Sequence, residues 1–416
     1  MRLRPLYLLA AFLLLAASQG TAGGVSAPRA IDAYAVFDAA AHILKTTYAG
    51  PRMLEVGALV DRQRQALVVA CSTAVVCPEK RGRSVVDAVI KNLGDGHSGA
   101  HWNVAVTAVQ EPADRRLTGL RLFPLLPGEL HVTHVRSNSA AERAGIQAGD
   151  ALLGFAGQSG MQTHDQLHTQ LLAHEERGEP FEVRLRSAGQ IKTVTLQGEL
   201  SPAVTLPSLR WAGKVAVISL PSLRTSTGLA FVSLVSLAGS QGAQGLVVDL
   251  RWNPGGFMSE ALIASQVLAG EQVSLKTVDR FGTVSFDWRV WKSQQAVFIR
   301  DIGLETWNKP VIVLTSAQTA SAGEMLAYWA QRSGAQVMGE ATMGLLNTGV
   351  AWTALPGGST LQVSDKRITL DGRTWLPERV EPDQVVVNTP GDWRAGKDRV
   401  MERAVASIAQ MNLAVR

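Results

Sequence analysis

Three apolar strands, each followed by a helical pattern, constrain the fold of this chain more than any other feature. The runs Val215–Leu220, Gly245–Leu250 and Val311–Thr315 are rich in Val, Leu and Ile and carry little charge. Strands that alternate with helices in this way form βαβ units around a largely parallel sheet. We therefore expect an α/β core over residues 201–390, followed by a C-terminal amphipathic helix in residues 391–416.

Two further regions precede this core. Residues 29–112 carry apolar residues at intervals of three and four, which is typical of helices, and contain a glycine-rich turn. Residues 116–200 change to short β-rich runs around one helical stretch near residues 163–176. With 416 residues, of which 46% are hydrophobic, the chain can bury several cores, so we expect a multidomain α/β protein.

The first 22 residues have the pattern of an export signal. Arg2 and Arg4 form a short basic region, the apolar run Leu6–Ala17 follows, and small residues suit cleavage after Ala22. Because the apolar run is shorter than the roughly 20 residues of a membrane-spanning helix, cleavage is favoured over an uncleaved anchor. We expect a periplasmic or extracellular protein.

The only two cysteines, Cys71 and Cys77, are close together in the sequence. The oxidising compartment of an exported protein permits a disulfide between them. The alternative is a pair of buried thiols on neighbouring turns of a helix, and the export signal favours the disulfide.

Charge and missing motifs exclude several classes of protein. The formal charge is +5, and two of the positive charges are Arg2 and Arg4 of the expected leader. The sequence contains no basic stripe, no P-loop and no Cys-x-x-Cys pair. We expect no nucleic-acid partner, no metal, no coenzyme and no other cofactor.

The β-rich region contains two motifs that resemble parts of a PDZ domain. Residues 137–157, with their Ala-Gly-Ile-Gln-Ala-Gly-Asp run, resemble the PDZ core, and residues 118–122 resemble the carboxylate-binding loop. In such a loop, backbone N–H groups converge on a terminal carboxylate, and an exposed strand edge pairs with an extended peptide. The alternative is a rigid spacer that binds nothing. The resemblance implies a PDZ-like domain over residues 116–200, with peptide-binding residues Gly119, Leu120 and Arg121.

Two strand ends in the α/β region carry groups suited to catalysis. The strand that ends at Asp249 runs into a Pro-Gly-Gly turn, where the amides of Gly255 and Gly256 could bind a phosphate or an oxyanion. Ser321 follows the next apolar strand at the turn into a helix, which exposes a nucleophilic hydroxyl and leaves the amide of Ala322 as a second donor. A single serine in such a place is more often only a helix cap. Two such turns in one sheet favour an active site.

A nucleophilic serine needs a base. The last of the eight histidines is His174, so no histidine lies in the α/β region. A histidine base must therefore come from an earlier region. His97, in a glycine-rich Asp-Gly-His-Ser turn, is the stronger candidate, and its neighbour His101 is the weaker one.

In this order, the motifs resemble the carboxyl-terminal processing (tail-specific) peptidases and their tricorn-like relatives. The motifs are Asp-Gly-His-Ser, the PDZ-like region, Asp-Leu-Arg-x-Asn-Pro-Gly-Gly and Thr-Ala-Ser-Ala-Gly-Glu. The resemblance covers nearly the whole chain after the leader and implies a spiral ββα core like that of caseinolytic peptidases (ClpP) and crotonases. It also implies that Ser321 is the nucleophile, and that the amide of Ala322 forms the oxyanion hole with Gly255 or Gly256.

One position departs from the Ser/Lys members of this family. They carry a general-base lysine where this chain has Leu345, and a leucine cannot accept a proton. The tricorn-like branch instead resembles a Ser/His/Glu arrangement, with its histidine in the turn that His97 matches. That resemblance implies that Glu378 orients His97, with Glu381 as second choice and Asp371 as third.

Three classes of function follow. The first is an exported serine endopeptidase acting on peptides or proteins, bound by their C-termini, with the PDZ-like domain presenting substrate or covering the catalytic groove. The second is a catalytically inactive peptide-binding protein on a peptidase scaffold, which the missing lysine favours. The third is a crotonase-like enzyme that holds a thioester enolate, and the export signal disfavours it because coenzyme A chemistry is intracellular.

Overall fold

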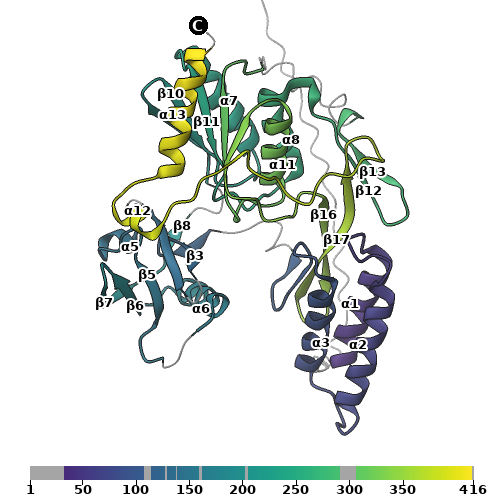
Figure 1. The fold of residues 1–416 in the computed structure, drawn as a ribbon. Helices are drawn as coiled ribbons and strands as arrows, with labels where there is room; N and C mark the ends of the chain where they lie inside the picture. The colour runs from purple at the N-terminus through teal and green to yellow at the C-terminus, as the bar shows by residue number, and fades with distance from the viewer. Residues whose placement is uncertain are drawn as a thin grey trace, which may run out of the picture.

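The computed structural model describes residues 32–106, 114–126, 129–136, 138–158, 162–201, 205–290 and 306–414. Within these ranges the chain forms a mixed α/β structure with four sheets, arranged as a core with two smaller parts below it (Figure 1). The expected leader, residues 1–22, lies outside the described residues. No helix in the described ranges is long and apolar enough to cross a membrane.

The central sheet is built from the second half of the chain. In spatial order its strands are β18 (Gln384–Val385), β15 (Gln336–Gly339), β14 (Val311–Thr315), β11 (Gly245–Asp249), β10 (Val215–Ser219) and β9 (Ser208–Ala212). Every neighbouring pair is parallel except β9 with β10. The three predicted strands are confirmed, and they lie next to one another at the centre of the sheet.

Helices cover both faces of this sheet. Alternate strand residues point to opposite sides, and those on both sides are apolar and buried. Ala216 and Ile218 face a cluster that contains three helices, whereas Val215 and Val217 face a single helix, α13 (Arg399–Ala414). The three helices on the first face are α7 (Thr227–Ser240), α8 (Met258–Ala269) and α11 (Ala322–Arg332). The predicted C-terminal helix is therefore part of the core.

A second sheet connects the N-terminal part to this core. Its strands are β1 (Gly99–His101), β17 (Ser359–Thr369), β12 (Lys276–Val278), β13 (Val284–Asp287) and, paired with β17, β16 (Thr348–Leu355). A short 3-10 turn, η1 (Gly270–Gln272), follows α8. Because β1 pairs antiparallel with β17, the Asp-Gly-His-Ser turn just before β1 lies beside the β16–β17 hairpin.

Three helices form an arm that extends from this hairpin, away from the core (Figure 1). They are α1 (Ala33–Thr47), α2 (Val56–Cys71) and α3 (Glu79–Leu93). Asp32 caps α1 through the N–H of Ala35, and Gly94, at φ +62°, ends α3 directly before the Asp-Gly-His-Ser turn. The predicted disulfide between Cys71 and Cys77 is present and closes the α2–α3 connection.

Residues 115–201 form the third part. An antiparallel sheet runs in the order β3 (Leu120–Leu126), β4 (Glu129–Val135), β5 (Ala151–Phe155), β6 (Phe181–Ser187), β7 (Gln190–Leu196). With it are α5 (Ala140–Arg143), α6 (His164–Arg177) and the strand pair β2 (Arg115–Leu117) and β8 (Glu199–Ser201). The helix expected near residues 163–176 is α6, capped by Thr163. A short helix, α12 (Pro390–Arg394), docks on this part, because Nε of Arg394 donates to the carbonyl oxygen of Gly149 at 3.0 Å.

Candidate active site

Ser321 lies in a strained turn between β14 and α11. Its φ of 51° and ψ of −118° are rare for a residue other than glycine and cost about 1–3 kcal/mol. Strain of this kind persists only where neighbouring groups hold it. Here the carboxylate of Glu324 accepts the N–H of Ser321 at 2.7 Å.

The Glu324 carboxylate also holds a second segment against this turn. It is fully buried, and it accepts hydrogen bonds from the hydroxyl of Thr342 and the backbone N–H groups of Gly344 and Leu345 at 2.6–2.9 Å. Burial raises the pKa of Glu324, and these three hydrogen bonds, together with the one from the N–H of Ser321, oppose the rise. Our sequence reasoning did not single out Glu324, although a glutamate three residues after a serine is a capping-box signal.

Asn253 ties the Pro-Gly-Gly turn to the serine turn. Its side chain is buried, its Oδ1 accepts the N–H of Gly255 at 2.8 Å, and its carbonyl oxygen accepts the N–H of Ala320 at 2.9 Å. Gly255 has φ +96°, and a Cβ there would lie 2.9 Å from Cβ of Ser321 and 3.0 Å from N of Ala322. The two turns predicted to form one site are therefore in direct contact.

The backbone N–H groups of these turns differ in availability. The N–H of Gly255 is occupied by Asn253. Among the described residues, the N–H groups of Gly256 and Ala322 have no hydrogen-bond acceptor. Of the two glycines that we expected as alternatives, Gly256 is thus the one whose amide remains free to bind an oxyanion.

His97 is buried, with 6% of its surface exposed. Asp95 accepts its backbone N–H, and the side-chain amide of Gln362 donates to its carbonyl oxygen. Its Nδ1 lies 2.9 Å from Oγ1 of Thr348 at the start of β16. Burial lowers the pKa of His97, while Asp95 and Thr348 act in the opposite direction, so the imidazole is neutral at neutral pH.

Leu345 lies between the serine turn and the histidine turn. Its backbone N–H donates to Glu324, and its Cδ2 lies 3.4 Å from the position that a Cβ on Gly96 would take. The position expected to carry a lysine therefore borders the residue next to His97. Within the described part of the chain, no hydrogen bond joins His97 to Ser321.

Among the described residues, none of the three acidic residues considered as partners of His97 is hydrogen-bonded to it. Glu378 borders the segment around Leu345, because its carbonyl oxygen accepts the N–H of Leu346 at 3.0 Å. Glu378 has 67% of its side chain exposed and pairs with Arg379 at 3.5 Å. Asp371 accepts the N–H groups of Arg373 and Thr374 in its own exposed turn, and Glu381 is also exposed. The partner that the structure gives to Nδ1, Thr348, is 251 positions away, and no local motif marked it.

His101, the weaker histidine candidate, lies on β1. Its Nε2 is 3.4 Å from Oε1 of Gln362, the residue whose amide nitrogen donates to the carbonyl oxygen of His97. His101 therefore belongs to the β1–β17 pairing rather than to the serine turn.

The loop predicted to bind peptides faces the core. The Arg121 guanidinium lies 5.7 Å from the ring centre of Trp252, the residue before Asn253, and the backbone of Leu120 pairs with β4. The Thr118 N–H and hydroxyl both donate to the buried carboxylate of Glu175. Gly119, at φ +90°, packs against Ser139.

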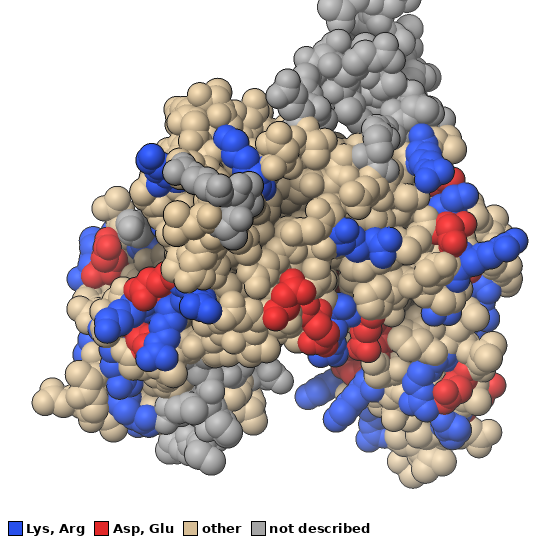
Figure 2. All heavy atoms as spheres, turned by 45° about the horizontal axis from the view of Figure 1, so that its top comes forward, with Lys and Arg blue, Asp and Glu red and all other residues tan. Residues whose placement is uncertain are grey.

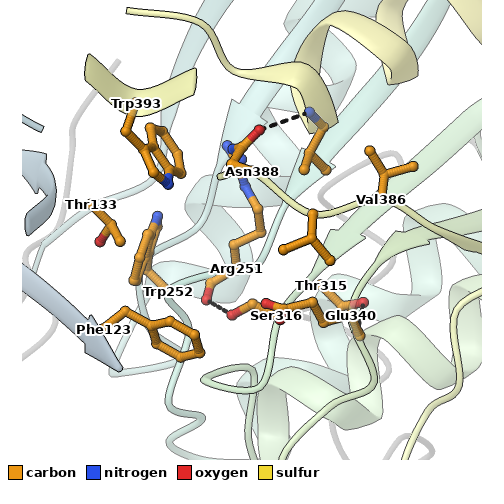
Figure 3. Close-up of a pocket in the computed structure, with 12 residues that line it drawn as sticks. Phe123, Thr133, Arg251, Trp252, Thr315, Ser316, Glu340, Val386, Asn388 and Trp393 are labelled. Atoms are coloured by element: carbon orange, nitrogen blue, oxygen red, sulfur yellow. Dashed lines mark hydrogen bonds between the residues drawn. The ribbon is translucent and has the colours of Figure 1, made fainter. Parts of the chain in front are cut away.

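A pocket opens where this region, the core and the C-terminal segment meet (Figure 3). Phe123, Trp252 and Trp393 form one side of it. On the other, Arg251 is paired with Asp249 and Asp398, and its carbonyl oxygen accepts the hydroxyl of Ser316. The lining contains none of the predicted catalytic residues, and its one guanidinium is already paired.

Comparison with known proteins shows what the core is similar to. Residues 214–386 match the model of peptidase family S41, a range that includes the Gly-Gly turn and Ser321 but not His97. The carboxy-terminal processing protease CtpA of Bacillus subtilis is 26% identical over 270 residues, which is 63% of this chain and 54% of that protein. The carboxyl-terminal-processing protease of Synechocystis is 29% identical over 231 residues, or 52% of this chain and 49% of that protein. The chain thus spans about half the length of these relatives.

Two solved structures share the fold over most of the chain. The photosystem II D1 C-terminal processing protease superposes with a TM-score of 0.56 at 18% identity and covers 86% of this chain and 94% of its own. Mature CPAF, solved in complex with lactacystin, superposes with a TM-score of 0.57 at 14% identity, covering 91% of this chain and 98% of its own. At these identities the likeness is one of fold.

Proposed function

We propose, from the peptidase family S41 domain over residues 214–386, that this protein is an exported serine endopeptidase in which a histidine replaces the usual lysine base. One observation carries the proposal: the strained serine turn is held in contact with a glycine turn, and each of the two turns offers one free amide, that of Ala322 and that of Gly256. In a serine peptidase, such amides stabilise the oxyanion of the tetrahedral intermediate.

The proposed chemistry is acyl transfer. Oγ of Ser321 attacks the scissile carbonyl carbon while Nε2 of His97 takes the serine proton, and the N–H groups of Gly256 and Ala322 bind the oxyanion. The imidazolium then gives its proton to the leaving amine, and the acyl-enzyme remains. Water, deprotonated by His97, hydrolyses the acyl-enzyme and releases the serine. The Ser321–His97 hydrogen bond forms in the substrate complex, since such bonds are often long in free enzymes.

Thr348 is the better-supported partner of the histidine. Its Oγ1 lies 2.9 Å from Nδ1 of His97. In the tautomer that the proposed mechanism requires, Oγ1 accepts from Nδ1–H, which leaves the lone pair on Nε2 for the serine proton. Glu378, inferred from family resemblance, is exposed and paired with Arg379, so it acts on His97 only if the segment around it moves. We therefore place Thr348 ahead of Glu378 as the positioning residue.

The remaining assignments extend the same proposal. Residues 116–200 act as a PDZ-like domain that binds a substrate C-terminus at Gly119, Leu120 and Arg121, and β3 lies at an edge of its sheet where a peptide strand could be added. The core is of the spiral ββα type. Export through residues 1–22 places the protein in the periplasm or outside the cell, where the disulfide persists.

A catalytically inactive peptide-binding protein is the second candidate. Leu345 in place of the lysine and the lack of a Ser321–His97 hydrogen bond among the described residues favour it. Reaction with a serine-directed fluorophosphonate, mapped to its residue by mass spectrometry, separates the two candidates. Labelling of Ser321 that is lost in His97→Ala but kept in His101→Ala is expected of the peptidase. An unlabelled Ser321 in the unmodified chain would support the catalytically inactive peptide-binding protein instead.

A further inference from the structure

The far end of the helical arm exposes four valines around the disulfide. We call this cluster, Val68, Val69, Val75 and Val76, the valine tip. Val75 is fully exposed, and the others are exposed to between 50% and 74%. The tip lies at the α2–α3 connection, the lowest point of the arm in Figure 1 and far from the core. An exposed apolar cluster of this kind marks an interaction site.

The valine tip itself is uncharged, and charged residues border it in the sequence. Residues 65–78 contain no charged side chain, whereas Glu79, Lys80 and Arg81 follow directly. In the described structure neither of these cations is in an ion pair, while the adjacent Glu79 is neutralised by Arg83. Figure 2 shows Lys and Arg side chains, with Asp and Glu side chains among them, on the lobe that the arm forms. The valine tip is therefore uncharged and apolar, and unpaired cations border it. Such an end complements a surface with an apolar interior and an anionic outer layer.

The start of the described chain also lies at this end. Asp32, the first described residue, pairs with Pro78, and the N–H of Ala33 donates to the carbonyl oxygen of Cys77 at 3.0 Å. The described part of the chain therefore begins beside the valine tip.

We propose that the valine tip docks on the surface of an anionic lipid bilayer, with its valines among the headgroups and Lys80 and Arg81 at the level of the phosphates. Exposed apolar side chains with neighbouring cations bind such interfaces, and each cation near the surface adds to the attraction. A second copy of the chain fits less well. Stable protein interfaces bury about 800 Å² per partner, which is more than four valines at the narrow end of an arm provide.

Hydrogen–deuterium exchange of the full chain tests this surface independently of peptidase activity. With vesicles of phosphatidylglycerol and phosphatidylcholine, we expect slower exchange in residues 66–78 and unchanged exchange in the central sheet. With phosphatidylcholine alone, protection should be weaker. Equal exchange with and without anionic vesicles would overturn the proposal, and so would protection that grows with protein concentration in the absence of lipid.

Variants locate the contact. In vesicle sedimentation, Val75→Asp/Val76→Asp should lower the partition coefficient at least tenfold, and Lys80→Gln/Arg81→Gln should lower it and reduce its salt dependence. Val385→Asp is the matched control, because Val385 is 72% exposed but lies on the core, and it should bind like the unmodified chain. Exchange without vesicles verifies that each variant is folded. Binding of the Val75→Asp/Val76→Asp chain at the level of the control would refute the proposal.

Discussion

At the scale of single residues, the proposed mechanism depends on a buried, neutral histidine. Burial lowers the pKa of His97 below its ordinary value of 6.5, and Asp95 offsets this only in part. The base is active when neutral, so kcat/KM should be full at neutral pH and should fall as the pH drops through a value below 6.5. A pH–rate profile from pH 4.5 to 9 measures this inflection. A limb that still rises above pH 8 would indicate a lysine base instead.

Thr348 permits a second residue-scale prediction. Thr348→Val keeps the shape of the side chain and removes the partner of Nδ1, so kcat should fall about five- to tenfold, the value of one hydrogen bond of about 1 kcal/mol. Thr348→Ser, which retains the hydroxyl, should stay close to the unmodified enzyme. If Glu378→Gln lowers kcat more than Thr348→Val does, the carboxylate rather than the threonine orients the histidine.

At the scale of elements, the site depends on contact between two strand-to-helix turns. Gly255→Ala places a Cβ 2.9 Å from Cβ of Ser321, so we expect a loss of about 10²–10³ in kcat, comparable to the loss of an oxyanion donor. Gly334→Ala is the matched control, because Gly334 has nearly the same φ, +95°, but nothing within 4 Å of the added methyl. It should lower stability by about 1 kcal/mol without changing kcat. Equal kcat values for the two variants would mean that the contact does not matter for catalysis.

The elements also show how far the sequence could predict this fold. β10, β11 and β14 could be predicted because each is a continuous apolar run, and Ser321 and the Gly-Gly turn could be predicted because strand-to-helix turns have local signals. The pairing of β1 with β17 joins residues about 260 positions apart, and β18 has only two residues, so neither has a local pattern. Thr348 was missed for the same reason, since its role arises from the β16–β17 hairpin.

At the scale of the whole molecule, the proposed site is assembled from distant parts of the chain. The serine and its amides come from the core, whereas the histidine comes from the turn that follows the arm and is held by the second sheet. Leu345 connects the serine turn to the histidine turn. Its N–H donates to Glu324, which holds the serine turn, and its side chain lies next to Gly96, the residue before His97. The range that matches the S41 family model, residues 214–386, therefore does not include the proposed base.

The most direct test of this assembly is the turnover of a fluorogenic peptide by single variants of the full chain. Ser321→Ala and His97→Ala should each remove most of kcat/KM. Lys366→Ala and Lys309→Ala should be nearly neutral, because Lys366 pairs with Asp365 at 2.9 Å and Lys309 donates to the carbonyl oxygen of Ala243. Near-normal turnover by His97→Ala together with its loss in Lys366→Ala would contradict the account and establish a relocated Ser/Lys pair.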